Sequence, residues 1–333
     1  MKLALKDLLL KTEPQYKGLL SIEWLTLGYV FVTSVLMLLF ASRIENLGGM
    51  IILRTGALVL IMTGYTVYRR YPSKGTLFLR VAFQIAMLAF WYPDLYNISR
   101  LFTNADHIIA TLEQLVFGCQ PAINFAENVT SHFLSECFYM GYLFYFPMIG
   151  ILLMYYFFMR NKEFVPAATI VLGAFFTYYL VFLFVPVAGP QYYFHAIGLD
   201  AARAGEFAPV GLWFDNSLEM LDPPGWKDGL FYQALAVVRE SERPVASFPS
   251  SHVGVSTIIM ILAVRTRNKG LIGILFPLWV FLCCATIYIR AHYVVDIIAG
   301  FITAPTVFWL LSRPKILGPI SERPNAPESL NQE

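Results

Sequence analysis

The chain carries, at residues 271–312, the stretch LIGILFPLWVFLCCATIYIRAHYVVDIIAGFITAPTVFWLLS, which decides its fold. Two apolar runs, 271–289 and 293–312, each come close to the roughly 20 residues that a helix needs to cross the hydrocarbon core of a membrane. The short polar string between them holds Arg290 and His292. The stretch therefore predicts two membrane helices joined by a bend that carries ionisable side chains.

The composition is that of a membrane protein. Of the residues, 57% are hydrophobic and 14% are charged, and the mean hydropathy is +0.60. Soluble domains carry roughly 25% charged residues, so a bilayer is the natural solvent of this chain. The formal net charge of +2 is small, and the basic residues lie in short clusters, which excludes a nucleic-acid-binding surface. The N-terminus lacks the pattern of a cleaved signal peptide.

Further apolar runs extend this pattern along the chain. They lie near residues 24–42, 50–68, 76–92, 135–158, 164–186 and 252–264. The third and the sixth of the runs are short, so neighbouring polar residues are expected to extend them, or their tilt to differ. We therefore predict an all-α polytopic membrane bundle of about eight transmembrane helices with an extracytoplasmic cap.

Basic residues indicate how the bundle is oriented. The clusters that fall on one side of the predicted spans lie at the N-terminus and near residues 69–74, 160–162, 265–269 and 313–315. Because positive charge accumulates on the cytoplasmic side of membrane helices, both termini are expected in the cytoplasm. Arg43 and Arg54 fall on the opposite side and count against this orientation.

Composition divides the chain into three parts. Residues 1–92 are expected to form N-terminal transmembrane helices, residues 93–312 a membrane domain that carries the polar motifs, and residues 313–333 a cytoplasmic tail. The tail contains several prolines among polar residues, so we expect it to be solvated and to carry no chemistry.

Two outer loops of the second part, 93–134 and 187–250, are unusually long. Their aromatic residues favour packing into a cap over the outer surface, although a disordered spacer is the alternative. Helical periodicity within them predicts an interfacial helix over 108–117 and another helix over 228–239.

The four cysteines are too few for a disulfide framework. Cys283 and Cys284 lie inside an apolar run, whereas Cys119 and Cys137 lie in or just beyond an outer loop. The latter two are either bonded to each other or free, and free buried thiols are the favoured prediction.

The string Phe248-Pro249-Ser250-Ser251-His252 stands at the start of the sixth predicted span. A Pro-Ser turn that leads into a helix leaves backbone N–H groups pointing outward, and such a helix start binds anions. The hydroxyls of Ser250 and Ser251 can cap the helix or donate to a phosphate, with His252 at the edge of the site. An ordinary N-cap with an interfacial histidine would show the same residues.

His292 and Asp296 are four residues apart at the start of the eighth predicted span. On a helix this spacing places both on one face, so the carboxylate can accept from one imidazole nitrogen and leave the other free to attack. The alternative is a structural bond between spans, because an ionisable pair in a membrane must be used or paired. Arg290 has a planar guanidinium that suits phosphate oxygens, or it snorkels to the interface.

The predicted topology brings these groups to one face of the membrane. His252 begins the sixth span and His292 the eighth, and both spans start on the extracytoplasmic side. Two histidines, a carboxylate, an arginine and a serine-rich turn supply the nucleophile, the acid and the anion-binding groups that phosphoryl transfer needs. The chain is therefore predicted to be a membrane phosphohydrolase or phosphotransferase. No metal or other cofactor is expected, since basic groups supply the electrostatic stabilisation.

The motifs resemble those of the type 2 phosphatidic acid phosphatase (PAP2) superfamily, and most nearly its inositol phosphorylceramide synthase-like branch. The resemblance is carried by the strings at 248–252 and 290–296 and by Gly-Pro-Gln-Tyr-Tyr-Phe at 189–194. It covers roughly residues 93–312, and the order and separation of the last two motifs make it specific.

The resemblance implies a role for each reactive residue. His292 would be the nucleophile that forms a phosphohistidine, His252 the acid that protonates the leaving group, and Asp296 the residue that orients the nucleophile. The residues expected to bind the substrate are Ser250, Ser251, Arg290, Gln191, Tyr193 and Arg243. The tyrosine would contact a headgroup, or it is an ordinary interfacial aromatic residue.

Two positions depart from the usual pattern of the superfamily. Most members have a first motif of Lys, six residues and then Arg-Pro, whereas Gln191 and its neighbours here include no Lys or Arg. The last motif usually has Arg six residues before its histidine, where this chain has Thr286. Arg290 is expected to replace one missing cation, and Arg243 or Arg203 another.

The expected function is that of an integral membrane lipid phosphatase. Its substrate would be a lipid phosphate or diphosphate in the outer leaflet, and its active site would face the extracytoplasmic side. One alternative is a phosphotransferase that moves a phospho-headgroup, for example inositol phosphate, onto a lipid or sugar hydroxyl. Another is a non-catalytic lipid-binding membrane protein that kept the fold but lost the first-motif cations. The sequence leaves hydrolysis and transfer open.

Overall fold

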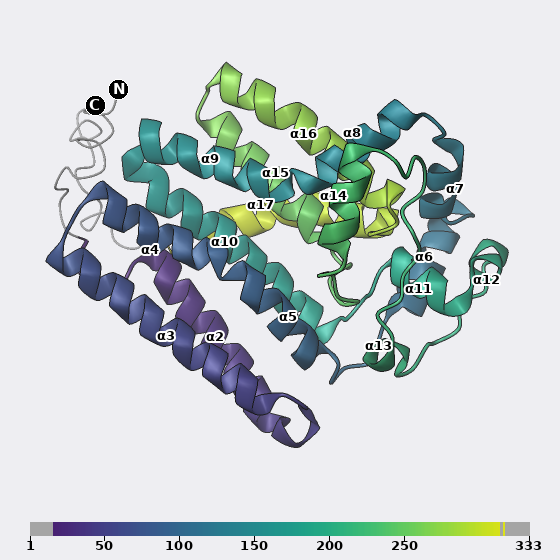
Figure 1. Cartoon of the computed structure of the whole chain (residues 1–333), viewed down its shortest axis with the longest axis horizontal. Helices are drawn as coiled ribbons and strands as arrows, with labels where there is room; N and C mark the ends of the chain where they lie inside the picture. The colour runs from purple at the N-terminus through teal and green to yellow at the C-terminus, as the bar shows by residue number, and fades with distance from the viewer. Residues whose placement is uncertain (1–15, 314–315, 317–333) are drawn as a thin grey trace. The chain divides into compact units, whose positions relative to one another are not determined.

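The computed structural model of the chain describes residues 16–313 and 316 (Figure 1). Within that part the regular secondary structure is helical, apart from one isolated parallel bridge between Val187 and Ala246. The elements are α2 (Ser21–Leu39), the 3-10 helix η1 (Ala41–Arg43), α3 (Leu47–Arg70), α4 (Lys74–Ala86), α5 (Leu88–Ser99), α6 (Asp106–Phe117), α7 (Pro121–Asn128), α8 (His132–Leu143), α9 (Tyr145–Met159), α10 (Asn161–Phe184), α11 (Pro190–Ile197), α12 (Leu199–Ala204), α13 (Trp213–Asn216), α14 (Leu230–Arg239), α15 (Ser251–Arg265), α16 (Lys269–Tyr288) and α17 (Val294–Leu311). The predicted all-α class is confirmed.

Six helical segments of the described chain are long and apolar enough to cross a membrane. They are α2, α3, the segment Lys74–Ser99 formed by α4 and α5, α10, α16 and α17. The fourth predicted span is a pair of helices, α8 and α9, bent by 54°, and would make a seventh if it crosses as one. The sixth predicted span is α15, which has 15 residues. The helices are thus those of a multi-pass membrane protein, and their number is close to the predicted one.

The bend between α8 and α9 has a local cause. Pro147 stands in the first turn of α9, where its ring would clash with the carbonyl of Leu143, the last residue of α8. Gly141 lets α8 approach α16 closely, since a Cβ there would lie 2.5 Å from the carbonyl carbon of Phe281. Both features shape the helix pair that carries part of the site described below.

Contacts within the chain divide it into two compact units. Of the described residues, 16–94, 153–173, 309–313 and 316 belong to the first unit, and 95–152 and 174–308 belong to the second. All three motifs identified in the sequence lie in the second unit.

The first unit buries two ion pairs among its apolar helices. Arg54 donates to both carboxylate oxygens of Asp94, at 2.5 and 2.7 Å, and Arg80 donates to both of Glu23, at 2.8 and 2.5 Å. A charge in a membrane span is costly unless it is paired, and a bidentate pair satisfies both partners. The ion pair with Asp94 explains the position of Arg54. Arg54 therefore no longer counts against the predicted orientation of the bundle.

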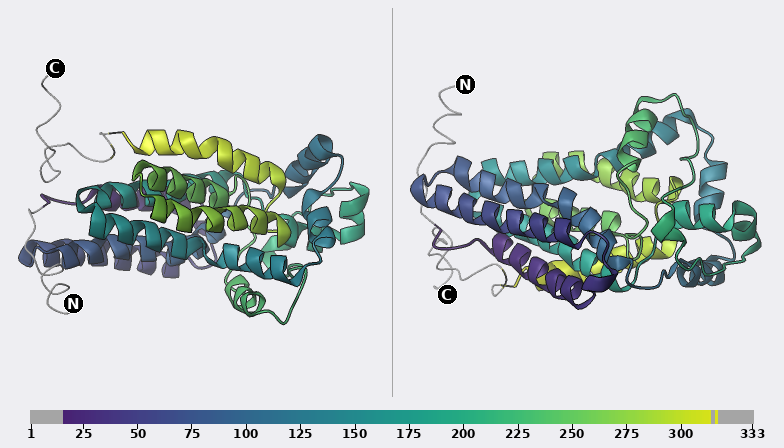
Figure 2. Two further views of the ribbon diagram at one scale, coloured as in Figure 1. Left: turned by 90° about the horizontal axis from the view of Figure 1, so that it is seen from above. Right: turned by 60° about the horizontal axis from the view of Figure 1, so that its bottom comes forward.

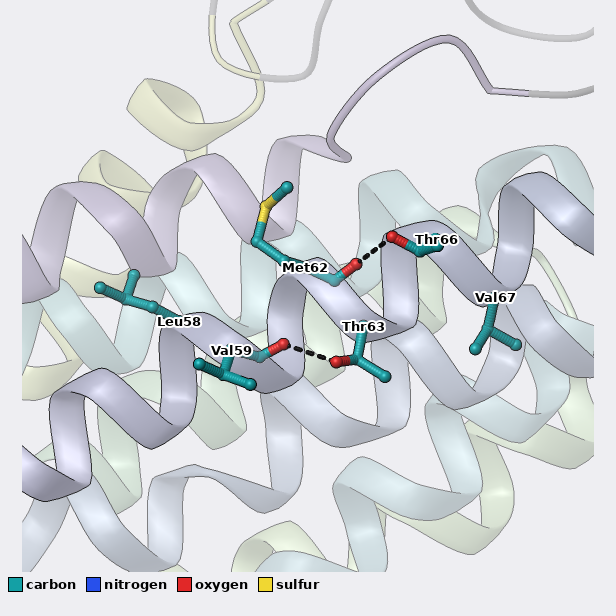
Figure 3. A pocket seen from close by; sticks show the side chains of 6 residues that line it. All are labelled: Leu58, Val59, Met62, Thr63, Thr66 and Val67. Carbon is teal, nitrogen blue, oxygen red and sulfur yellow. Dashed lines mark hydrogen bonds between the residues drawn. The ribbon is translucent and has the colours of Figure 1, made fainter.

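A shallow hollow lies on the side of α3 in the same unit (Figure 3). It is lined by Leu58, Val59, Met62, Thr63, Thr66 and Val67. The hydroxyls of Thr63 and Thr66 each donate, at 2.8 Å, to the carbonyl four residues earlier in the helix. The hollow therefore presents methyl groups and aliphatic side chains, which suit contact with lipid tails.

The helices around the motifs pack closely in the second unit. α16 packs along α8 and α15, and α14 packs on α8 (Figures 1 and 2). α17 approaches α15 at Gly300, where a Cβ would lie only 2.8 Å from the carbonyl oxygen of Ser250. These contacts fix the start of α15 beside the start of α17.

The two long loops predicted at 93–134 and 187–250 share one hydrophobic core, also in the second unit. Its buried members include Ile109, Ala110 and Ile123 from the first loop, Tyr192, Tyr193, Phe194, Ala202 and Phe214 from the second, and Tyr293 from the last motif. The helices expected at 108–117 and 228–239 correspond to α6 and α14. Cys119 and Cys137, like the other two cysteines of the described chain, are free.

Candidate active site

The two motif histidines face each other in the second unit. His252 Nδ1 lies 3.1 Å from His292 Nε2, and the ring planes meet at 67°. His252 is the second residue of α15, whereas His292 stands in the bend before α17. The structure therefore brings together the two side chains that the sequence predicted to converge.

Backbone contacts fix the orientation of His292. Its Nδ1 lies 2.9 Å from the carbonyl oxygen of Ser247, and its backbone N–H donates to the carbonyl of Thr286 at 3.0 Å. A carbonyl can only accept, so Nδ1 carries the hydrogen and Nε2 keeps its lone pair. This assignment directs the Nε2 lone pair toward His252.

Asp296 contacts His292 indirectly and not through the expected hydrogen bond. The expectation placed both residues on one helix, but α17 begins at Val294, so His292 lies outside it. His292 Nδ1 and Asp296 Oδ2 are 3.6 Å apart, beyond hydrogen-bonding distance. Ser247 Oγ instead donates to Asp296 Oδ2 at 2.5 Å and lies 3.3 Å from His292 Nδ1. The sequence missed Ser247, because a serine just outside a motif carries no distinctive signal.

Two tyrosines hold the ring of His252. Tyr142 stacks on it with centroids 4.8 Å apart, and Tyr145 packs against it with centroids 4.6 Å apart. The Tyr145 hydroxyl also donates to the carbonyl of Ser251 at 3.1 Å. Because these tyrosines flank the bend between α8 and α9, the bend sets the orientation of His252.

The turn before α15 is tied to the last motif. Ser250 N–H donates to the backbone carbonyl of Asp296 at 3.0 Å, and its hydroxyl accepts from Val253 N–H at 3.3 Å. The hydroxyl therefore caps the helix, which is one of the two uses that the sequence allowed. Ser251 is also buried, at 6% exposure, directly beside His252.

The first motif meets the other two at Gly189. Its φ is +94°, and a Cβ there would lie 2.5 Å from the carbonyl oxygen of Ala291 and 3.0 Å from Ser247 Oγ. The next-but-one residue, Gln191, donates its backbone N–H to the carbonyl of Arg290 at 2.7 Å. The first motif thus contacts the last motif and Ser247, which directly precedes the second motif, at a point where only glycine fits.

Gly189→Ala should therefore disturb the site and the fold together. The added methyl group would push the backbone of Ala291 away from its place, in a conformation that is itself unfavourable for alanine. We expect a loss of about 2 kcal/mol or more in unfolding free energy, together with loss of activity. Thermal unfolding of the purified protein measures the first effect. Gly150→Ala, where nothing lies within 4 Å of the added Cβ, is the matched control.

Asp106 of α6 supports this junction from behind. Its Oδ1 accepts from Gly189 N–H at 2.9 Å and from the Tyr293 hydroxyl at 3.0 Å, and its Oδ2 accepts from Ala188 N–H at 2.6 Å. Burial raises the pKa of Asp106 to about 6, although these donors and the Asn104 amide oppose the shift. One carboxylate therefore connects the first motif to the last.

Glu113, also on α6, contacts the start of α17. Its Oε2 accepts from Val295 N–H at 3.1 Å, and the side chain is fully buried. Burial raises the pKa of Glu113 to about 8, and the nearby charge of Asp296 raises it further, against the effect of the backbone donors. The carboxyl group is thus protonated near neutral pH.

Glu113→Gln should change how stability depends on pH. The folded state holds a proton that the unfolded chain gives up near the ordinary pKa of 4.5, so wild-type stability falls as pH rises from there to about 8. The variant lacks this loss, so its Tm should exceed the wild-type Tm at about pH 9 by several degrees and match it more closely at about pH 5. Thermal melts at both pH values test this. The exposed Glu206→Gln should show no such difference, and equal behaviour of both variants would contradict the prediction.

The three arginines expected to replace the missing motif cations differ in their burial and in their contacts. Arg290 lies in the bend with φ of +63° and 9% exposure, and its Nη1 donates to the carbonyl of Asp222 at 3.3 Å. Arg243 uses Nη1 on the carbonyls of Glu240 and Glu242. Arg203 is exposed and forms ion pairs with Glu127 and Asp200. Of these three, Arg290 is therefore the buried one, two residues before His292 in the chain.

Gln191 contacts a cation that the sequence did not single out. Arg239, the last residue of α14, donates from Nη2 to Gln191 Oε1 at 2.9 Å and is 5% exposed. The Gln191 amide nitrogen donates to Glu242 Oε2 at 2.9 Å. Tyr193 is fully buried, and its hydroxyl donates to the carbonyl of Ala208 at 2.9 Å. An arginine at the end of a cap helix resembles an ordinary helix-terminal charge, so sequence alone gave no signal for Arg239.

One comparison with known proteins identifies the family of this chain. Among the described residues, no group of three or more His, Cys, Asp and Glu side chains is placed to hold a metal ion. No curated protein and no solved structure matches the chain. The family model described as the PAP2 superfamily matches residues 106–310, which include both histidines, Asp296 and Gln191. The chain belongs to the PAP2 superfamily.

Proposed function

We propose that the chain is a membrane phosphatase that hydrolyses a lipid phosphate or diphosphate through a phosphohistidine intermediate. The observation that carries this proposal is the 3.1 Å contact between His252 Nδ1 and His292 Nε2. This contact supports the proposal because it brings a nitrogen lone pair within reach of a second imidazole, which can carry a proton. Membership of the PAP2 superfamily supports phosphatase or phosphotransferase chemistry in general.

The contacts suggest a two-step reaction. The lone pair of His292 Nε2 attacks phosphorus, and the N–P bond forms as the P–O bond to the lipid breaks. His252, carrying a proton, gives it to the departing oxygen. In the second step His252 removes a proton from water, whose oxygen attacks phosphorus while the N–P bond breaks.

Ser247 and Asp296 support both steps. The Ser247 carbonyl holds the Nδ1 hydrogen of His292, at 2.9 Å, so that the ring keeps its orientation. The phosphohistidine ring carries positive charge, which the nearby carboxylate of Asp296 stabilises at 3.6 Å from Nδ1.

We place this site on the extracytoplasmic side of the membrane, with both termini in the cytoplasm. The basic clusters between the apolar helices support this orientation. A lipid in the outer leaflet would then present its phosphate to the start of α15 and keep its tail between the spans.

Transfer to a lipid or sugar hydroxyl is the second candidate, and one cluster of contacts favours it. Glu242 accepts from the Tyr142 hydroxyl at 2.7 Å and from Gln191, and Tyr142 stacks on His252. A carboxylate in this position can accept a further hydrogen bond from the hydroxyl of a lipid or sugar substrate and hold that hydroxyl near the phosphohistidine. Water would then be replaced as the attacking group.

Incubation of purified protein with candidate lipids, without added metal, tests both candidates. The lipids are phosphatidic acid, an isoprenyl diphosphate, and a phosphoinositide together with a ceramide acceptor. Release of inorganic phosphate that is lost in His292→Ala supports the phosphatase. A new phospholipid without matching phosphate release supports the transferase. Lipid binding without either product would overturn both and favour a non-catalytic lipid-binding role.

A further inference from the structure

We propose that Arg239 of the cap helix α14 and Arg290 of the last motif together bind the phosphate group of the substrate. The two guanidinium groups are held by adjacent peptide carbonyls. Arg239 Nη2 donates to the carbonyl of Leu221 at 2.8 Å, and Arg290 Nη1 donates to that of Asp222 at 3.3 Å. Two side chains that are 51 positions apart in the numbering, from 239 to 290, thus converge on one stretch of the cap.

Neither guanidinium group forms an ion pair within the described chain. Arg239 and Arg290 are 5% and 9% exposed. The Nε atom of each is buried without a hydrogen-bond partner. Buried charges are costly unless they are paired, so two unpaired neighbouring cations call for an anion.

The electrostatics of Arg290 agree with this. Burial lowers the pKa of Arg290, the charge of Arg239 lowers it further, and the charge of Glu127 opposes the shift. Arg239 is therefore close enough to repel Arg290. Binding of a phosphate would replace this repulsion with two attractions, because guanidinium groups match phosphate oxygens in geometry as well as charge.

Gln191 connects the pair to the catalytic motifs. Its side-chain oxygen accepts from Arg239 Nη2, and its backbone N–H donates to the Arg290 carbonyl, which the left-handed backbone of Arg290 directs toward it. Its backbone carbonyl accepts from Leu221 N–H at 2.9 Å. One neutral residue thus holds both arginines and the intervening cap segment without cancelling their charge. Gln191 is a positioning residue in this proposal.

The anion site adjoins the histidine pair. Arg290 is two residues before His292, and Gln191 is bonded through Glu242 to Tyr142, whose ring stacks on His252. Arg239 is the last residue of the cap helix α14. The first turn of this helix is held by Glu136 of α8, which accepts from the Phe231 and Tyr232 N–H groups. The cap loop thereby contributes directly to substrate binding.

This inference deepens the proposed function and takes its ligand from it, so its test uses inorganic phosphate and does not require turnover. Titration calorimetry of the purified full chain in metal-free buffer measures the Kd for inorganic phosphate. We expect Arg239→Gln to weaken binding by about tenfold to a hundredfold, as loss of one charge-assisted hydrogen bond would. Arg239→Lys should recover part of the affinity, whereas Arg160→Gln, on an exposed pair with Glu163, should leave it unchanged.

A second variant keeps the test decisive if Arg239→Gln does not fold. Gln191→Glu keeps the size of the side chain but supplies an internal carboxylate to Arg239, so this variant should abolish phosphate binding. Gln191→Met supplies no charge and should weaken phosphate binding less. Equal affinity in wild type and all variants, or no phosphate binding by the wild type, would overturn the inference. Arginine-dependent phosphate binding without turnover of any lipid would instead refute the phosphatase and leave this anion site in place.

Discussion

His292→Ala should lower kcat/KM for the lipid substrate by about four orders of magnitude or more, because it removes the only proposed nucleophile. In the structure His292 Nε2 is the lone-pair nitrogen that faces His252, and its other nitrogen is committed to the Ser247 carbonyl at 2.9 Å. No neighbouring group among the described contacts can take over this geometry. The loss should appear in kcat, since the phosphate-binding groups remain.

The matched control is His195→Ala. His195 lies in the cap and pairs with Glu219 at 3.1 Å, away from the histidine pair, so its replacement should leave kcat/KM within a few-fold of wild type. A covalent readout adds an independent measurement. Brief reaction with lipid labelled in its phosphate, followed by denaturation, should leave an acid-labile phosphoramidate on wild type and none on His292→Ala. Label that persists in the variant would contradict the mechanism.

The sequence predicted the fold well, because membrane helices are specified locally. A run of apolar residues in lipid satisfies its backbone groups by forming a helix, and each predicted span overlaps one or two helices of the structure, although several predicted ends lie just outside them. The departures also have local causes. Pro147 breaks the fourth span, and the start of α15 is fixed by the Ser250 cap and leaves a helix of 15 residues.

The core of the candidate site was predictable for a related reason. In the predicted topology the spans that begin at His252 and His292 enter the membrane from the same side, so counting the predicted spans was enough to bring the two residues together. The detailed geometry was not, because it depends on where a helix begins. With α17 starting at Val294, His292 falls in a bend, and the contact expected with Asp296 is made through Ser247.

Residues from the cap could not be located from the sequence. Arg239 became a candidate only when the structure placed it against Gln191, 48 residues away. The signal in such a case is tertiary: burial of a charge without a counter-charge is invisible in a string of residues. The same applies to Tyr142 and Tyr145, which read as ordinary apolar residues of a span until they are seen against His252.

His252→Ala should separate substrates by their leaving groups. If His252 protonates the departing oxygen, the variant should lose about 10²–10⁴-fold in kcat/KM on an alkyl lipid phosphate, whose alkoxide leaves poorly. The p-nitrophenolate group of an aryl phosphate such as p-nitrophenyl phosphate leaves without protonation. The rate on this substrate should therefore fall by about tenfold or less. His252 Nδ1 lies 3.1 Å from His292 Nε2, so a phosphorus atom attacked by that nitrogen would lie within reach of His252.

Parallel assays of both substrates with wild type, His252→Ala and the control His132→Ala decide the point. His132 is exposed and stacks on Trp226, so its loss should affect neither substrate. An equal loss on both substrates would mean that His252 binds the phosphate without acting as an acid.

Tyr142 and Tyr145 fix the ring plane of His252. Replacing Tyr145 with Phe keeps the aromatic ring against His252 and removes only the hydrogen bond to the Ser251 carbonyl. This variant should therefore leave the leaving-group dependence intact. Selective loss on the alkyl phosphate would then belong to the imidazole itself, which is what general acid catalysis requires.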